Sequence, residues 1–343
     1  MKTFIISRTD AIGDVVLTLP LCGWLKQQYP GCRVVLLGRS YTQAVAAACP
    51  AVDAFLNDDE LRQLPEAEQV AALQQVQADA IVHVFPNRRL ASLARKAGIS
   101  HRIGTRSRWF HWLTCNRLVA LSRRHSPLHE AQLNCQLLRP LGLNHTPELA
   151  DLQPLGKLRP DEPVPADIAA LLERGSSQQR NVVLHPGSRG SGRDWPLEFY
   201  GQLARLLHAQ GHRVFITGTA AEGQQLQSWL QEHAAYCINL TGRLSLGQLI
   251  GFIAWADGLV AASTGPVHLA AALGRHALGL FVPMRPMHPG RWAPLGPRAE
   301  YLVLDKPDCN TCRHDASVCS CIRTIAPAAV AARIEAWQPL AAQ

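Results

Sequence analysis

The sequence lacks any long apolar run. No window of the 343 residues approaches eighteen uninterrupted apolar side chains, about the length that a membrane-spanning helix needs. The opening apolar stretch is also too short for a secretory signal peptide. We therefore expect a cytoplasmic protein. In that compartment the ten cysteines are expected to be thiols or metal ligands and not a disulfide framework.

Charge is also scarce, and one sign is missing from a long segment. Charged residues make up 17% of the chain and apolar residues 47%, so it can bury substantial cores, and its length allows two domains. Residues 80–129 contain ten Arg or Lys and no Asp or Glu. Such a block predicts an anionic partner: nucleic acid, a membrane surface, or a phosphorylated or carboxylated substrate. A solvated basic face without a ligand is the alternative.

Strand and helix patterns alternate in both halves of the chain. Strands are predicted at 3–7, 33–38, 80–85 and 101–104, and again at 181–187, 213–218, 258–263 and 277–282. Helical patterns separate them, at 15–29, 41–48 and 59–77, then at 197–209, 221–233, 246–256 and 266–273. This alternation predicts an α/β fold of parallel, doubly wound sheets. We expect two Rossmann-like domains facing a central cleft that holds the ligand.

The segment between the two halves is rich in proline and acid and predicts a linker. The expected organisation is an N-terminal domain over 1–150, a linker over 151–180 and a C-terminal domain over 181–325. Residues 326–343 are expected to form a helix that packs back on the N-terminal domain.

The loop after the first predicted strand, SRTDAIGDVVLTLP, has little glycine. Gly13 stands alone, so the loop lacks the G-x-G-x-x-G pattern that cradles a dinucleotide's pyrophosphate. Asp14 instead places a carboxylate there. Taken alone, Asp14 is best interpreted as a helix N-cap.

Two motifs in the second half predict an anion site. In LHPGSRGSGRDWPLEFY, small residues allow backbone N–H groups to approach an anion, and Arg189 or Arg193 can add charge-assisted hydrogen bonds. In ASTGPVHLAAALG, Ser263 or Thr264 is expected to cap a helix whose first amides face a diphosphate. An ordinary glycine-rich turn and a merely well-capped helix are the alternatives.

The motif ITGTAAEG places Glu222 four residues after the end of a predicted strand. A carboxylate near the carboxyl end of a Rossmann strand can accept hydrogen bonds from ribose hydroxyls. A solvated glutamate at a helix start is the alternative.

These motifs, together with PMRPMHPGRWAPLGP, resemble glycosyltransferase family 9, the ADP-heptose:lipopolysaccharide heptosyltransferases. The resemblance runs from residue 1 to about residue 337. It implies a GT-B fold, an ADP-heptose donor in the C-terminal domain and a lipid A-linked inner-core acceptor, Kdo or heptose, on the N-terminal domain. It also implies transfer with inversion and no catalytic metal or other cofactor.

The resemblance assigns roles to individual residues. The catalytic base falls on Asp14, close to Arg8 and Gly13 on the acceptor side. The donor-binding residues are expected to be Ser188, Arg193, Glu222, Ser263, Thr264, Gly265 and His268. The family more often has Asp where this chain has Ser263, so the donor pocket carries one negative charge fewer.

The basic block then becomes the acceptor side. SRRHSPLHEAQLN resembles the family's acceptor segment, so Arg123, Arg124 and His129 are expected to bind Kdo carboxylates or lipid A phosphates. Trp109, Phe110 and Trp112 either touch the membrane surface or are core aromatics. The protein is therefore expected at the cytoplasmic face of the inner membrane, in peripheral contact with it.

The tail contains CNTCRHDASVCSC. Its four cysteines, Cys309, Cys312, Cys319 and Cys321, form a candidate structural zinc or iron site, although the last pair is closer together than in zinc fingers. Three other functions stay open. They are a GT-B transferase using another nucleotide sugar or a protein acceptor, a GT-B-like epimerase, and a nucleic-acid-binding protein, which would leave Asp14 unexplained.

Overall fold

The computed structural model describes residues 1–123, 126–176, 178–188, 190, 192–285, 287–306, 309, 311–312, 315 and 319–340. The chain divides into two compact units, Met1–Leu158 and Arg159–Gln343. The boundary falls inside the predicted linker. Each unit is described below by itself.

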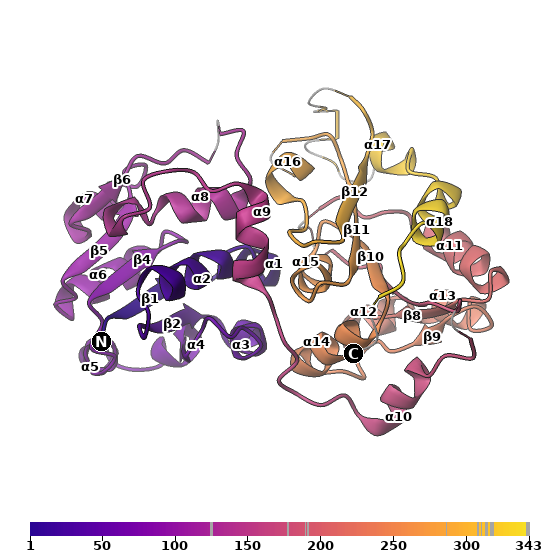
Figure 1. The fold of residues 1–343 in the computed structure, drawn as a ribbon, viewed down its shortest axis with the longest axis horizontal. Helices are drawn as coiled ribbons and strands as arrows, with labels where there is room; N and C mark the ends of the chain where they lie inside the picture. The colour runs from indigo at the N-terminus through magenta and orange to yellow at the C-terminus, as the bar shows by residue number, and fades with distance from the viewer. Residues whose placement is uncertain are drawn as a thin grey trace. The chain divides into compact units, whose positions relative to one another are not determined.

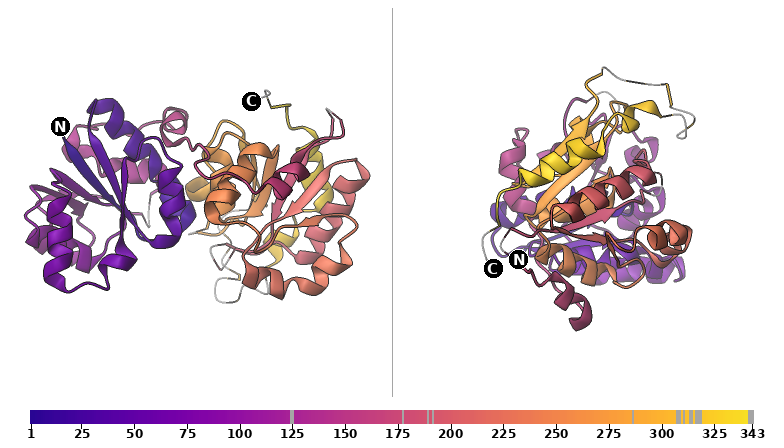
Figure 2. Two further views of the ribbon diagram at one scale, coloured as in Figure 1. Left: turned by 90° about the horizontal axis from the view of Figure 1, so that it is seen from below. Right: turned by 90° about the vertical axis from the view of Figure 1, so that its right-hand side faces the viewer.

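The first unit is built on a parallel sheet of six strands in the described chain, in the order β3-β2-β1-β4-β5-β6. The strands are β1 (Thr3–Ser7), β2 (Arg33–Gly38), β3 (Ala54–Asn57), β4 (Ala80–His83), β5 (His101–Thr105) and β6 (Arg117–Val119). The helices are α1 (Ile12–Val16), α2 (Leu19–Gln28), η1 (Ser40–Thr42), α3 (Gln43–Ala47), α4 (Asp58–Leu61), α5 (Glu66–Gln75), α6 (Arg88–Lys96), α7 (Trp109–Thr114), α8 (Glu130–Gln136), η2 (Arg139–Leu141), α9 (Leu149–Leu152) and η3 (Gln153–Gly156). Helices lie on both faces of the sheet (Figures 1 and 2), as in a doubly wound fold.

The second unit repeats this topology, in the order β12-β11-β10-β7-β8-β9. Its strands are β7 (Asn181–His185), β8 (Arg213–Ile216), β9 (Ile238–Asn239), β10 (Gly258–Ala262), β11 (His276–Phe281) and β12 (Ala299–Val303). Its helices are α10 (Ala166–Ala169), η4 (Ala170–Leu172), α11 (Leu197–Ala209), α12 (Ala220–Gln225), α13 (Gln227–Glu232), α14 (Leu246–Trp255), α15 (Gly265–Ala272), α16 (Pro289–Trp292), α17 (Ser320–Arg323) and α18 (Pro327–Glu335). The prediction of two Rossmann-like, doubly wound α/β sheets is confirmed.

Proline explains where two predicted helices break. The pattern over 59–77 splits into α4 and α5, because Pro65 stands at the N-cap of α5 and cannot continue the preceding helix. The pattern over 15–29 splits into α1 and α2, with Pro20 in the first turn of α2.

Each sheet has a topological switch point, where its strand order reverses and where open α/β sheets bind ligands. In the first unit this point lies between β1 and β4, and Ser7 is in register with His83. In the second unit it lies between β7 and β10, and His185 is in register with Ala261. The predicted base and the predicted diphosphate turn each follow one of these strands.

The C-terminal helix buries its apolar side chains within the second unit. Helix α18 belongs to the second unit, where it packs on α11 and adds Val330, Ala331 and Ile334 to the core. These apolar side chains are buried next to α11, and packing of this helix on the N-terminal domain stays a prediction. No helix of the described chain is both long and apolar enough to span a membrane.

Candidate active site and its two binding surfaces

The end of β1 carries a buried arginine that gathers three carboxylates. Arg8 follows β1 directly, and its side chain is 3% exposed. Its Nε donates to Asp10 at 2.6 Å, its Nη2 donates to Asp14, and its Nη1 lies 3.2 Å from Glu130. These acids come from the loop after β1, from α1 and from α8. Three carboxylates around one guanidinium make a compact acidic site at the switch point.

Asp14 does not act as a helix cap. Ala11 is the N-cap of α1, and Asp14 is the third residue of the helix. Its carboxylate pairs with Arg8 and keeps one fifth of its side chain exposed, whereas Arg8 is buried. The N-cap interpretation is therefore wrong. Arg8 therefore holds the Asp14 carboxylate in place, while part of its side chain stays accessible to solvent.

Burial and charge act in opposite directions on this cluster. Burial opposes the charge of Arg8, but attraction by Asp10, Asp14 and Glu130 outweighs it and raises the arginine's pKa. Burial raises the pKa of Asp10 to about 6, against attraction by Arg8 and with added repulsion from Asp14. Asp10 therefore titrates near neutral pH while Arg8 stays charged. Nothing in the sequence around Asp10 predicted this raised pKa.

The floor beneath the cluster is buried and uncharged. Ser7 and His83, at the adjacent ends of β1 and β4, are fully buried. Burial lowers the pKa of His83 to about 3, so its ring is neutral at physiological pH. The charges at this switch point therefore belong to Arg8 and the acids around it.

The predicted acceptor residues lie beside this cluster. Arg123 donates from Nε to Glu130 at 3.0 Å and from Nη2 to Asn134 at 3.0 Å, so Glu130 bridges Arg8 and Arg123. His129 is buried at the N-cap of α8, where its ring accepts a hydrogen bond from the N–H of Ala131. The helix contains Glu130, so this cap helps to position the carboxylate that Arg8 and Arg123 share.

Gly13 and Arg124 are the two remaining residues predicted on the acceptor side. Gly13 lies buried inside α1, one residue before Asp14. Arg124 falls outside the described residues.

In the second unit, glycines in the loop after β7 lie close to the start of α12 and to the turn after β10. A Cβ on Gly187 would lie 2.9 Å from the carboxylate of Glu222, and one on Gly192 would lie 3.0 Å from the Cβ of Ser263. The loop after β7 thus approaches both the start of α12 and the turn after β10. Glycine at these two positions lets the loop come this close, because a larger side chain would push Glu222 or Ser263 aside.

Glu222 has a local partner as well as this position. It is the third residue of α12, and its carboxylate accepts hydrogen bonds from the N–H and hydroxyl of Thr219 at 2.6 and 2.9 Å. Thr219 returns the bond in a capping box. The capping box therefore holds Glu222 near the carboxyl end of β8, beside Gly187.

The side chain at the N-cap of α15 does not cap the helix. Thr264 occupies the N-cap position, but its side chain makes no capping hydrogen bond among the described residues. Pro266 lies in the first turn, as predicted, and no acid precedes it in the helix. The positive end of an eight-residue helix favours an anion. His268 in the same helix is buried, as is Ser188 in the loop after β7.

Arg193 is tied to the tail of the chain. Its Nη2 donates to the carbonyl of Cys312 at 2.6 Å, and next to it Trp195 donates to the carbonyl of Ile325 at 2.9 Å. The loop after β7 is thereby fixed to the C-terminal segment. Arg189 lies outside the described residues.

The four tail cysteines are buried in the core of the second unit. Cys309 interacts with Cys321 and Cys312 with Cys319, so the four thiols form two pairs. Among the described residues no group of three or more His, Cys, Asp or Glu side chains is placed to hold a metal ion. None of the four forms a disulfide among the described residues.

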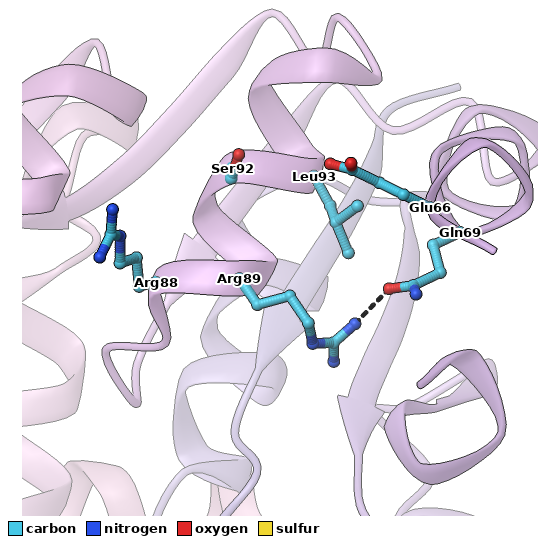
Figure 3. Close-up of a pocket in the computed structure, with 6 residues that line it drawn as sticks. All are labelled: Glu66, Gln69, Arg88, Arg89, Ser92 and Leu93. Carbon is cyan, nitrogen blue, oxygen red and sulfur yellow. Dashed lines mark hydrogen bonds between the residues drawn. The ribbon is translucent and has the colours of Figure 1, made fainter. Parts of the chain in front are cut away.

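A cavity of about 550 Å³ in the first unit contains none of the predicted residues. It is lined by Glu66, Gln69, Arg88, Arg89, Ser92 and Leu93. Arg89 turns toward Gln69, to which it donates a hydrogen bond, while Arg88 points the other way (Figure 3). Arg89 also pairs with Asp58, a carboxylate that it shares with Arg62.

Known proteins match the chain over most of its length. The family model for glycosyltransferase family 9 (heptosyltransferase) matches residues 68–322. A protein of Haemophilus influenzae that is named only as a putative glycosyltransferase is 26% identical over 319 residues, covering 90% of both chains. Lipooligosaccharide heptosyltransferase 2 of the same organism is 25% identical over 295 residues, covering 81% of this chain and 82% of the relative.

A solved structure, the Escherichia coli ADP-heptose lipopolysaccharide heptosyltransferase II, has a TM-score of 0.76 at 22% identity and covers 98% of both chains. Two Rossmann-like units matched over their full length to this enzyme define the GT-B class of fold. Within that class, the chain belongs to glycosyltransferase family 9 and is a glycosyltransferase.

Proposed function

We propose that this chain transfers a heptose from ADP-heptose to Kdo or heptose of the lipopolysaccharide inner core, with inversion at the anomeric carbon. Relatives named lipooligosaccharide or lipopolysaccharide heptosyltransferase support the reaction class. Because such an acceptor is anchored to lipid, the proposal places the chain at the cytoplasmic face of the inner membrane, in peripheral contact with it.

The observation that carries the proposal is the state of Asp14. A general base must be ionised, oriented and open to the hydroxyl it deprotonates. Arg8 forms an ion pair with the Asp14 carboxylate and fixes its direction, while one fifth of the Asp14 side chain stays exposed. Asp14 therefore takes the proton of the acceptor hydroxyl as that oxygen bonds to the anomeric carbon of heptose.

The departing group needs stabilisation on the donor side. When the bond between the anomeric carbon and the diphosphate oxygen breaks, its electron pair goes to ADP and negative charge develops on the β-phosphate. Arg193 and the N–H groups of Thr264 and Gly265 are the groups assigned to that charge. A guanidinium and helix amides supply this role without a metal ion. Glu222 is assigned to the ribose hydroxyls, with Ser188, Ser263 and His268 lining the same surface.

The acceptor is assigned to the first unit. Arg8, Gly13, Arg123, Arg124 and His129 are assigned to the acceptor, because inner-core sugars bring carboxylates and phosphates that match arginine. Arg123 donates to protein partners but keeps about a fifth of its side chain exposed. That exposed edge is the part proposed to meet the acceptor. The four tail cysteines have no part in this proposal.

The test is incubation of the full chain with ADP-heptose and a panel of truncated inner-core acceptors, scored by ADP release and product mass. We expect one heptose added to one class of acceptor, with the anomeric configuration inverted. Parallel reactions use other ADP- and UDP-sugars and a protein acceptor. Transfer from one of those alone would replace the proposal, and a sugar isomer formed without acceptor would identify an epimerase.

A further inference from the structure

Helix α7 presents an apolar face to solvent. Its side chains Trp109, Trp112 and Leu113 are 61%, 60% and 62% exposed. They lie within five consecutive positions, whereas the other exposed large apolar side chains of the described residues are scattered over the chain. The core-aromatic interpretation of Trp109 and Trp112 is therefore wrong. An exposed cluster of this kind indicates an interaction surface.

The opposite face of α7 is firmly attached to the domain. His111 is fully buried, and its Nδ1 accepts a hydrogen bond from the N–H of Thr105 at 3.0 Å. Phe110 packs its ring on His111, with centroids 4.7 Å apart. The helix packs on α6 and β5. Figure 1 shows it close to the edge strand β6. Its exposed tryptophans are therefore held outward on a rigid support.

Arginines anchor α7 and surround it. Arg95 donates to the carbonyl of Leu113 at 2.7 Å, Arg102 donates to that of Thr114 at 2.8 Å, and Arg88 stacks over the ring of Trp109 at 4.9 Å. Arg106, Arg108 and Arg117 lie exposed next to the helix in sequence. In the described part of the chain none of these six arginines forms an ion pair with a carboxylate. The face therefore combines apolar side chains with uncompensated positive charge.

We propose that α7 and its surrounding arginines, the α7 face, dock the enzyme on an anionic phospholipid bilayer. Tryptophan side chains prefer the interface between lipid headgroups and acyl chains, and leucine enters the apolar layer. Exposed arginines meet lipid phosphates, which attract basic residues near the surface. Charge complementarity selects an anionic over a zwitterionic membrane. The inference deepens the proposed function and rests on it, because a lipid-anchored acceptor is reached from such a surface.

Nucleic acid is a weaker match for the same face. Sequence-independent binding to single strands uses aromatic rings on which bases stack in succession. Here Arg88 already covers the ring of Trp109, and the indole N–H of Trp112 donates to the carbonyl of Arg106 at 3.0 Å. Leu113 offers no ring to a base. The aliphatic side chain of Leu113 beside the two tryptophans fits an acyl layer better.

The test is cosedimentation of the full-length chain with phosphatidylcholine vesicles, with and without about one quarter phosphatidylglycerol. We compare the wild type with W109S/L113S, with R106S/R108S and with the matched control W255S, which removes a tryptophan 56% exposed in the second unit. Binding to the mixed vesicles is expected for the wild type and W255S, with a shift of tryptophan emission to shorter wavelength. Each double variant is expected to bind at least tenfold more weakly. Thermal melts verify that all variants fold.

Three outcomes would overturn the inference: no binding of the wild type to anionic vesicles, equal binding of the double variants, or displacement by a DNA oligonucleotide at equal phosphate concentration. Turnover of a short, lipid-free acceptor is expected to be unchanged in both double variants. If that turnover is absent in the wild type while vesicle binding persists, the proposed function fails and the docking surface stands.

Discussion

Arg8 and Asp14 form an ion pair in which the arginine is buried and the carboxylate is one-fifth exposed. Arg8 is the first residue after β1, and Asp14 is the third residue of α1. Because the strand and the helix hold these two positions, the ion pair fixes the direction of the Asp14 carboxylate. Because Arg8 also binds Asp10 and Glu130, its charge is shared among three acids. The arrangement orients Asp14 while leaving part of it free for a substrate hydroxyl.

Replacing Asp14 by Asn tests the base directly. Asparagine keeps the size of the side chain and a hydrogen-bond acceptor for Arg8, but it cannot take a proton. We expect kcat to fall by about a hundredfold to ten-thousandfold, the range for loss of a general base. The affinity for ADP-heptose, measured by calorimetry, and the melting temperature are expected to stay close to those of the wild type. Turnover near the wild-type value in a folded D14N protein would remove Asp14 from the mechanism.

Asp10 predicts a pH dependence of stability. Its usual pKa is 3.8, and burial raises it to about 6 in the folded chain, where Arg8, Asp14 and the hydroxyl of Tyr41 face it or its backbone. Between these values the folded state binds more protons than the unfolded state, so stability falls as pH rises from about 4 to about 6. The difference in unfolding free energy between wild type and Asp10→Asn should change by about 2 to 3 kcal/mol across that window.

Urea titrations at several pH values measure this difference. Asp59→Asn is a control, because the pKa of Asp59 is lowered and its contribution is lost in the opposite direction, as pH falls. A wild-type-minus-D10N difference that stays flat between pH 4 and 6 would contradict the burial of the Asp10 carboxyl.

The strands that form the middle of each sheet were predictable, and the side-chain partners were not. Runs such as those of β1 and β2 are apolar and continuous, because strands buried on both faces admit little else. The edge strands β6 and β9 are short and partly exposed, so their sequences carry little signal. Glu130 lies 122 residues from Arg8, and only the parallel topology brings α8 to the end of β1. Asp14 was found through a motif, whereas Asp10 needed the burial that the fold creates.

His129 offers a way to separate a structural role from a substrate contact. Its ring caps α8, so His129→Ala is expected to lower the unfolding free energy by about 1 kcal/mol. Asparagine is a good cap, and His129→Asn should restore most of that stability. If the ring also contacts the acceptor, H129N will be as stable as the wild type but will show a raised KM for the inner-core acceptor and an unchanged KM for ADP-heptose. Equal acceptor KM values would leave His129 with the cap alone.

Glu222 allows a similar separation on the donor side. Glutamine at this position also completes the capping box with Thr219, so Glu222→Gln should leave the melting temperature unchanged. A neutral acceptor binds ribose hydroxyls more weakly than a carboxylate, by about 1 kcal/mol. The Kd for ADP is therefore expected to rise about fivefold. Glu198→Gln, at an exposed ion pair with Arg323, is the control. An unaltered Kd in E222Q would return Glu222 to a purely local role.

Cys309 is expected to titrate near pH 7. Hydrogen bonds from the hydroxyl and backbone of Thr311 and from Cys321 lower its pKa to about 7, whereas burial raises the pKa of Cys321 to about 11. The absorbance of thiolate near 240 nm should therefore rise by one equivalent with a midpoint near pH 7, and Cys309→Ser should abolish that step. Thr311→Val is expected to move the midpoint upward, because it removes the hydroxyl that stabilises the anion. Elemental analysis of protein purified without chelator runs alongside. One zinc or iron per chain with no step at pH 7 would show that the cysteines ligate a metal instead.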